Sequence, residues 1–361
     1  MAKRLFWLIL VLLGLGLVVL SSASVVQSAK QYGVSYYFWR HQLFYGILPG
    51  LSLLWFFWRF DYKHLRHLSL PILGVAFLAM VVVLFPAYGR QINGSRSWLD
   101  IGPIVFQPAE ILKFALIIYF AAWFGNKSDR VKNSENRLLP LFVISGIVAG
   151  LLLKQPDLGM LGIISLIIGG MFFIAGGSLR SSIAALLIAC VLIVGYAATS
   201  PVRWRRITTL LHPTADVRGS GWQINQSLIA IGSGGVMGVG LGQSTQKFGF
   251  LPEPIGDSIF AILIEELGMV GGLSTLALFL LFAVLMAHIA RSAPDDFGAL
   301  LVSGMALWVM IQALVNMTAV MGLMPLTGVP LPFISYGGTS MAAMLAGLGV
   351  ALNVAEHTNH S

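Results

Sequence analysis

Long apolar runs alternate with short polar connections over most of the 361-residue chain. A helix needs about 20 apolar residues to cross a bilayer, and lipid offers no partner for unpaired backbone N–H and C=O groups. The pattern therefore predicts an all-α polytopic membrane protein that forms a single integral membrane domain over residues 1–361. About ten spans are expected: 5–26, 38–58, 69–87, 108–124, 138–153, 160–177, 181–199, 268–290, 297–318 and 338–355.

The composition excludes an ordinary soluble protein. Hydrophobic residues make up 57% of the chain and charged residues only 10%, whereas soluble domains are about a quarter charged. The net charge of +8 is scattered between the spans, so it favours topology signals and contacts with anionic lipid over nucleic-acid binding. The single cysteine, Cys190, excludes an internal disulfide and a Cys-based metal site.

The distribution of Lys and Arg predicts the orientation in the membrane. They are more frequent in the short connections on the side of the N-terminus, which places both termini in the cytoplasm. The first run follows Lys3-Arg4 and ends in small residues, like a cleavable secretory signal, but its length favours a retained signal anchor. The fifth run is short and ends at Lys154, so it and the sixth are tilted or joined by a turn that dips into the membrane.

Residues 200–257 form a long loop on the outer side, between the seventh and eighth spans. Loops longer than about 15 residues are usually functional or disordered. This one opens with Pro201–Leu211, where Arg and Trp alternate with aliphatic residues, which predicts a helix lying in the membrane interface. Two interpretations stay open for this helix: a topological anchor, or a grip on a lipid diphosphate headgroup.

Glu110 and Lys113 are ionisable residues at membrane depth, and such residues are functional hypotheses by default. Their spacing puts them on one face of the fourth helix, where they can pair. The pair is either a structural ion pair or part of a polar cavity inside the bundle, and both can hold together.

A second cluster surrounds Asp257, where two prolines and two glycines predict an irregular turn before an apolar helix. We expect Asp257 at the N-cap of that helix, beside the positive end of the helix dipole. A plain cap is one interpretation, and a general base facing a substrate at the outer membrane boundary is the other. Glu265 and Glu266 follow, and at least one of them should face protein.

A third cluster, residues 324–340, holds three prolines in an apolar setting. Irregular backbone at membrane depth is tolerated only where it is buried in protein or lines a cavity. The cluster therefore predicts a re-entrant loop before the tenth span.

Six short motifs occur in one order along the chain: Arg96-Ser97-Trp98-Leu99, Gln107-Pro108-Ala109-Glu110, Lys154-Gln155-Pro156-Asp157-Leu158-Gly159, Gly232-Ser233-Gly234-Gly235, Leu251-Pro252-Glu253 and Pro332-Phe333-Ile334-Ser335-Tyr336-Gly337-Gly338. In this order they resemble the SEDS family of cell-wall proteins (shape, elongation, division and sporulation). The resemblance covers about residues 85 to 355. Within the family, residues 238–249 resemble the division and sporulation members more than the elongation members.

The resemblance implies a peptidoglycan glycosyltransferase at the outer face of the bacterial cytoplasmic membrane. It would polymerise lipid II and release undecaprenyl diphosphate, in cell division or septal wall synthesis. The family's essential aspartate maps onto Asp257, although Asp257-Ser258 stands where many members have Thr-Asp-Phe. As a hypothesis, Asp257 takes the proton from the acceptor's 4-hydroxyl. The alternatives are a lipid II flippase, an elongation polymerase and a scaffold of a division complex.

The leaving diphosphate needs cationic help from Arg, Lys or a divalent cation, Mg²⁺ or Mn²⁺, whose ligands the sequence does not indicate. The cationic candidates on the outer side are Arg96, Lys154, Arg203, Arg205, Arg206 and Arg218. The resemblance also implies a class B penicillin-binding transpeptidase and other division proteins as partners. The residues expected around the substrate or the cavity are Arg96, Gln107, Glu110, Lys113, Lys154, Asp157, Arg203, Arg206, Glu253, Ser335, Tyr336, Gly337 and Gly338.

Overall fold

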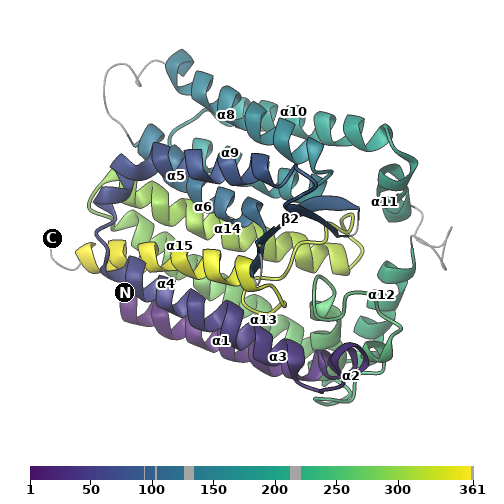
Figure 1. Cartoon of the computed structure of the whole chain (residues 1–361). Coiled ribbons are helices and arrows are strands. Elements are labelled where there is room, and N and C mark those ends of the chain that lie inside the picture. The colour runs from purple at the N-terminus through teal and green to yellow at the C-terminus, as the bar shows by residue number, and fades with distance from the viewer. Residues whose placement is uncertain (93, 102–103, 126–133, 212–220, 359–361) are drawn as a thin grey trace.

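The computed structural model describes residues 1–92, 94–101, 104–125, 134–211 and 221–358. They form a bundle of helices, and each predicted span coincides with a helical segment, so the all-α fold is confirmed (Figure 1). The segments are α1 (Ala2–Ala23), the continuous run of α3 (Tyr37–Gln42), η1 (Leu43–Ile47) and α4 (Leu48–Arg59), α5 (Lys63–Val82), α6 (Pro108–Phe124), α8 (Ser134–Lys154), α9 (Leu158–Ile174), α10 (Leu179–Ala198), α13 (Ile259–Arg291), α14 (Asp296–Val320) and α15 (Gly338–His357).

Length and hydropathy identify this as a multi-pass membrane protein. Among the described residues, six helices are long and apolar enough to cross a bilayer, namely α1, α5, α10, α13, α14 and α15, and shorter apolar helices add to them. Burial separates the centre of the bundle from its edge. Most residues of α6 are buried, as are 72% of the α15 span, but only 11% of the α10 span is buried. A helix that is apolar all round can occupy either place, because lipid and protein interior are equally apolar.

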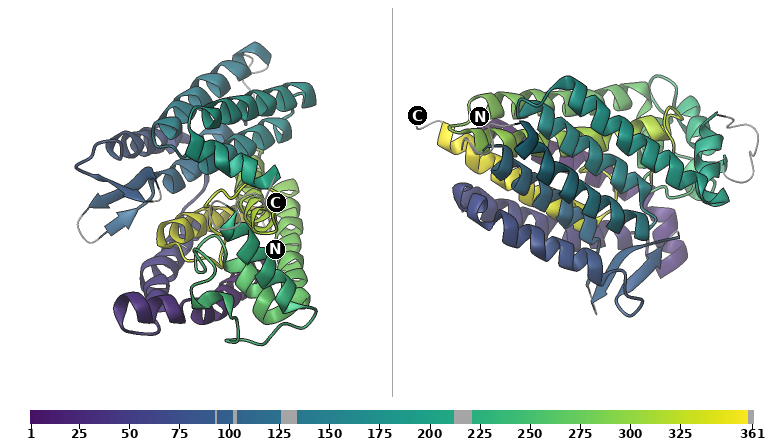
Figure 2. Two further views of the ribbon diagram at one scale, coloured as in Figure 1. Left: turned by 90° about the vertical axis from the view of Figure 1, so that its right-hand side faces the viewer. Right: turned by 90° about the horizontal axis from the view of Figure 1, so that it is seen from above.

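The two chain ends lie at the same end of the bundle (Figure 1 and, from two other sides, Figure 2). The opposite end carries β2, α11 and α12, and we call it the distal end. An even number of membrane crossings brings both termini to one side, so this arrangement fits ten spans.

A small antiparallel sheet at the distal end was not predicted. Its strands β1 (Gly89–Ile92), β2 (Ser95–Ile101) and β3 (Ile104–Phe106) lie in the order β1-β2-β3 between α5 and α6. An open sheet edge is costly only within lipid, where its backbone groups have no water to bond. The apolar pattern of the chain reports the spans and carries no comparable signal for such short strands.

The long loop between α10 and α13 contains helices of its own. A helix is present where Arg, Trp and aliphatic residues predicted one, namely α11 (Pro201–Leu211), with Trp204 exposed, and its place in the membrane interface stays a prediction. It is followed by α12 (Trp222–Gly234) and a single 3₁₀ turn, η2 (Gln246–Phe248). A shorter helix, α2 (Val25–Tyr32), lies between α1 and α3.

Helix α13 joins the helix expected after Asp257 to the eighth predicted span (268–290), and it bends sharply at Gly268. This glycine has φ +71°, and a Cβ there would collide with the backbone of Val236 and Gly238. A Cβ on Gly272 would lie 3.1 Å from the Ile264 side chain, although eight residues of straight helix span about 12 Å. The first turns of α13 therefore fold back beside the rest of the helix.

Residues 321–337, between α14 and α15, form the predicted re-entrant loop. Leu331 and Phe333 are almost fully buried although neither lies in a helix. The ring centroid of Phe333 lies 6.2 Å from that of Phe279 and 6.1 Å from that of Phe282, both inside α13. Irregular backbone is thus surrounded by protein, as membrane depth requires.

Gly16 of α1 lets this loop approach the helix. A Cβ on Gly16 would collide with the carbonyl oxygen of Phe333, whereas a Cβ on Gly14 would meet nothing within 4 Å. Gly16→Ala should therefore destabilise the protein by about 1–3 kcal/mol relative to Gly14→Ala, through overpacking. Both substitutions change helix propensity equally, so the difference between their thermal unfolding midpoints in detergent measures the contact. Equal midpoints would show that the loop gives way freely.

Candidate active site

Asp257 lies in the turn immediately before α13 and is half-buried. The prediction that it is the N-cap is wrong. The N-cap is Ser258, which makes no side-chain capping bond. The helix begins one residue later than the sequence suggested, so the Asp257 carboxylate lies just ahead of the helix N-terminus. The partial positive charge of that N-terminus still favours an anion there.

Two neutral amides hold Asp257 in place. Gln223 of α12 donates from Nε2 to Oδ1 of Asp257 at 3.1 Å and to Oγ of Ser258 at 2.9 Å. Asn316 of α14 donates from Nδ2 to the carbonyl oxygens of Asp257 and Val329, both at 2.8 Å. The carboxylate and its backbone are therefore fixed by different helices, and Asn316 joins the turn to the re-entrant loop.

Ser335 and Tyr336 of the re-entrant loop bond directly to the Asp257 turn. The Ser335 hydroxyl donates to the carbonyl oxygen of Gly256 at 2.7 Å, and the Tyr336 N–H donates to that of Ile255 at 2.9 Å. The structure thus brings these two predicted site residues next to Asp257. Both of these bonds end on backbone carbonyl oxygens of the turn, so Ser335 and Tyr336 set its position.

The other side of the re-entrant loop rests on α3. The Tyr336 hydroxyl lies 2.9 Å from Nδ1 of His41, and the Gly337 N–H donates to Oε1 of Gln42 at 3.0 Å. A Cβ on Gly338 would lie 3.1 Å from the carbonyl oxygen of Tyr45, so this glycine allows close packing of backbones.

Glu253 begins the same turn as Asp257. It has φ +48°, and its carbonyl oxygen accepts from the N–H groups of Gly256 and Ser258 at 3.0 and 3.3 Å. Its side chain is exposed. Glu253 therefore shapes the turn through its backbone and presents a second carboxylate close to Asp257 in the chain.

Glu110 and Lys113 form a fully buried ion pair with a Nζ–Oε2 distance of 2.9 Å. Lys113 also donates to Oε1 of Gln312 at 2.7 Å, and Nε1 of Trp308 donates to the same oxygen at 2.9 Å. Gln312 in turn donates to the carbonyl oxygen of Pro330 at 2.9 Å. The pair thus ties α6 to α14 and, through Gln312, to the re-entrant loop.

Gln107 and Asp157 form a separate pair. Asp157 is the N-cap of α9 and accepts from the N–H of Met160 at 3.0 Å. Its other oxygen lies 3.4 Å from Nε2 of Gln107, the residue just before α6. The contact links the starts of two helices, which is a structural role.

The predicted cations lie on elements other than the Asp257 turn. Arg96 of β2 donates to the carbonyl oxygen of Leu84 at 3.4 Å, and the guanidinium of Arg203 in α11 lies 4.0 Å from the centroid of the Tyr196 ring. Each has one buried nitrogen without a hydrogen bond, Nε in Arg96 and Nη1 in Arg203. Lys154 and Arg205 are exposed. The side chain of Arg206, and Arg218 altogether, lie outside the described part of the chain.

Glu265 and Glu266 are both buried, which confirms the prediction that at least one of them faces protein. Glu265 accepts from Ser244 and Thr245, while Glu266 pairs with Lys247 at 2.8 Å and accepts from Ser22 of α1 at 2.6 Å. These bonds fasten α1 and the long loop between α10 and α13 to the folded-back part of α13. Both carboxylates thus stabilise the fold-back of α13 at Gly268.

Sequence reasoning missed the neutral polar residues of the site. Gln312 and Asn316 stand four residues apart on one face of an apolar helix, and this spacing is a readable signal. Charged residues at membrane depth are the stronger signal, and these amides carry no charge. Gln42 and His41, at the start of the second span, are polar residues of the same kind next to an apolar run, whereas Gln223 lies in the loop and has no such signal.

Comparison with known proteins agrees with this geometry. The family model described as "Cell cycle protein" (FtsW/RodA/SpoVE) matches residues 3–360. Stage V sporulation protein E of Bacillus subtilis is 39% identical over 354 residues, covering 97% of this chain and 96% of that protein. A probable peptidoglycan glycosyltransferase FtsW of Coxiella burnetii is 37% identical over 353 residues, covering 97% and 94%.

Two solved structures share the fold over nearly the whole length. One belongs to a study of polymerization and crosslinking by a peptidoglycan synthase complex, with a TM-score of 0.81, 30% identity and coverage of 99% of this chain and 98% of that one. The other is the rod shape determining protein RodA of Thermus thermophilus, with a TM-score of 0.71, 28% identity and coverage of 98% and 96%. On this match of sequence and fold, the chain belongs to the FtsW/RodA/SpoVE family of cell cycle proteins.

Proposed function

We propose that the protein is a peptidoglycan glycosyltransferase that polymerises lipid II into glycan strands during cell division or septal wall synthesis. The observation that carries the proposal is the Asp257 carboxylate, held at 3.1 Å by Gln223 in a turn that the re-entrant loop supports. The names of the FtsW relatives support the reaction, and the identity to sporulation protein E supports the division and sporulation branch.

In the proposed reaction Asp257 is the general base. Its carboxylate takes the proton from the 4-hydroxyl of the acceptor's N-acetylglucosamine. The oxygen attacks the anomeric carbon of the donor's N-acetylmuramic acid and forms a β-1,4 bond. The bond to the diphosphate oxygen breaks, and undecaprenyl diphosphate leaves with the electron pair. Gln223 and Asn316 keep the base in position, and the pre-set geometry lowers the entropy cost of the step.

Charge on the leaving diphosphate needs compensation. Arg96, Lys154, Arg203 and Arg206 are the proposed cations, because β2, α8 and α11 all present residues toward the distal end. The divalent cation, Mg²⁺ or Mn²⁺, stays a prediction. Within the described residues no three His, Cys, Asp or Glu side chains come together as a metal site, so these residues alone offer an incomplete set of ligands and the proposed reaction has no step that uses a metal.

We further propose that both termini are cytoplasmic and that the distal end, with Asp257, faces outward. Lipid II carries its sugars on the outer side at the polymerisation stage, so the base must lie there. A class B penicillin-binding transpeptidase is the proposed partner, together with other division proteins. The similarity to a peptidoglycan synthase complex supports a crosslinking partner.

Purified protein in detergent or nanodiscs, supplied with lipid II, tests the proposal. Gel separation of the products should show glycan ladders, with and without the transpeptidase partner and with Mg²⁺, Mn²⁺ or chelator. If the protein moves lipid II across vesicle membranes but makes no polymer under any of these conditions, it is a flippase and the proposed glycosyltransferase activity is wrong.

A further inference from the structure

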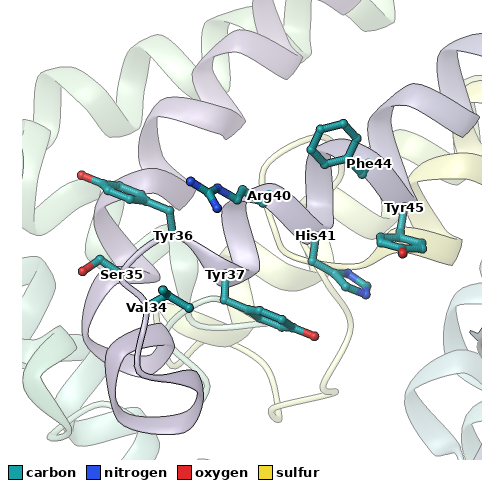
Figure 3. Close-up of a pocket in the computed structure, with 8 residues that line it drawn as sticks. All are labelled: Val34, Ser35, Tyr36, Tyr37, Arg40, His41, Phe44 and Tyr45. Atoms are coloured by element: carbon teal, nitrogen blue, oxygen red, sulfur yellow. The ribbon is translucent and has the colours of Figure 1, made fainter.

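A pocket of about 500 Å³ opens at the outer end of the second span, and none of the groups proposed to act in the reaction lines it (Figure 3). Its volume lies within the ~300–1,000 Å³ typical of small-ligand sites. The walls that matter here come from α3, the residue before it and η1: Tyr36, Tyr37, Arg40, His41, Phe44 and Tyr45.

Aromatic rings follow one another along this wall. Tyr37, His41 and Tyr45 are each four residues apart and share one helix face. The ring centroids of Tyr37 and His41 are 5.9 Å apart and those of His41 and Tyr45 are 4.6 Å apart, with planes inclined by 29° and 22°. Tyr45 and Tyr36 are 65% and 53% exposed, so flat ring surfaces remain open to a ligand.

This combination of surfaces matches a sugar. An aromatic face carries negative charge density, which attracts the C–H groups on the flat side of a pyranose ring. The hydroxyl and acetamido groups at the edge of the sugar need hydrogen-bond partners, and the Arg40 guanidinium and the tyrosine hydroxyls supply them. A hydrocarbon tail would match only the rings and would leave the polar groups without partners.

Two contacts through Tyr336 connect the pocket to the Asp257 turn. His41 lies 2.9 Å from the Tyr336 hydroxyl, and the N–H of Tyr336 bonds to the carbonyl oxygen of Ile255, two residues before Asp257. A chain of sugars that passes Asp257 would therefore reach the aromatic wall over a short path.

We propose that this pocket is a glycan-binding subsite, in which the exposed rings of Tyr36 and Tyr45 and the Arg40 guanidinium hold sugar rings of the strand being made. Tyr37 supports this wall, because its ring is stacked between those of Tyr32, at 3.6 Å, and His41. The inference rests on the proposed function, and it adds that these residues influence the length of the glycan strands. A strand held at the pocket stays with the enzyme between transfers, so it grows longer before it dissociates.

The binding test uses the full chain in lipid nanodiscs and tetra-N-acetylchitotetraose, a sugar probe without lipid or diphosphate. The double variant Tyr36→Ala/Tyr45→Ala should bind it about tenfold more weakly than the wild type. Tyr88→Ala is the matched control, because Tyr88 is 54% exposed and lies in the loop after α5, and it should bind normally. Unchanged binding by the double variant, at a normal unfolding midpoint, overturns the proposal.

Strand length provides the second readout. With lipid II, the double variant should produce shorter strands while the rate of the first transfer stays within about twofold of the wild type. Strands of wild-type length overturn the role in retention. A double variant with a lowered unfolding midpoint and normal probe binding assigns the rings to membrane anchoring instead. If the wild type makes no polymer, the proposed function fails, and probe binding alone still decides whether the pocket takes sugars.

Discussion

Asp257→Asn should lower the rate of glycan polymerisation at least about 100-fold, the size expected for losing a general base. The amide keeps the shape of the side chain and an oxygen that can accept from Gln223, which is 3.1 Å away in the wild type. It cannot take up the proton of the acceptor hydroxyl. Initial rates of strand synthesis from lipid II, with the purified variant, measure the effect.

Asp100→Asn is the matched control for this substitution. Asp100 lies in β2 at the same end of the molecule, is partly exposed, and has no role in the proposed reaction. Its variant should polymerise within about twofold of the wild-type rate. Full strand synthesis by Asp257→Asn would remove the base assignment, while membership of the family would stand.

The spans were predictable because the bilayer leaves the chain few choices. Helix α6 begins at Pro108 and ends at Phe124, as the sequence indicated. Proline suits a first helical turn, and the apolar run stops at Phe124. The re-entrant loop was predictable for the complementary reason. Its prolines exclude a helix, and its apolar residues exclude a water-exposed loop.

The fold-back of the first turns of α13 could not be predicted in the same way. Residues 259–267 are too few to span a membrane, and their fold-back depends on Gly268 packing against the backbone of Val236 and Gly238. That contact joins parts of the chain some thirty residues apart, so no local pattern reports it.

The site was only half readable from the sequence. Asp257, Ser335 and Tyr336 belong to motifs, and the structure joins them through backbone bonds. Gln223 and Asn316 reach the Asp257 turn from helices far away in the chain, and a neutral amide is a weak signal without that geometry. A charged residue in a membrane span is costly and therefore marks a site in the sequence. The residues that hold such a charge in place are often neutral, and the sequence does not mark them.

Lys113→Met should destabilise the protein by about 3–5 kcal/mol, since it leaves the carboxylate of Glu110 buried without its cation. Lys113 also lies 4.8 Å from the centroid of the Trp308 ring and 2.7 Å from Oε1 of Gln312, and both contacts are lost. The double variant Glu110→Gln/Lys113→Met removes both charges of this pair and should recover much of the loss. Thermal unfolding midpoints in one detergent compare the variants.

Lys63→Met provides the control, because Lys63 is exposed at the start of α5 and its loss should cost less than about 0.5 kcal/mol. A double variant as unstable as Lys113→Met would show that the charges do not compensate each other. Activity per folded molecule then separates the two interpretations of the pair. If the folded double variant polymerises at the wild-type rate, the pair is structural and links α6 to α14 and the re-entrant loop. If the variant is fully folded but inactive, the two charges take part in binding or converting the substrate.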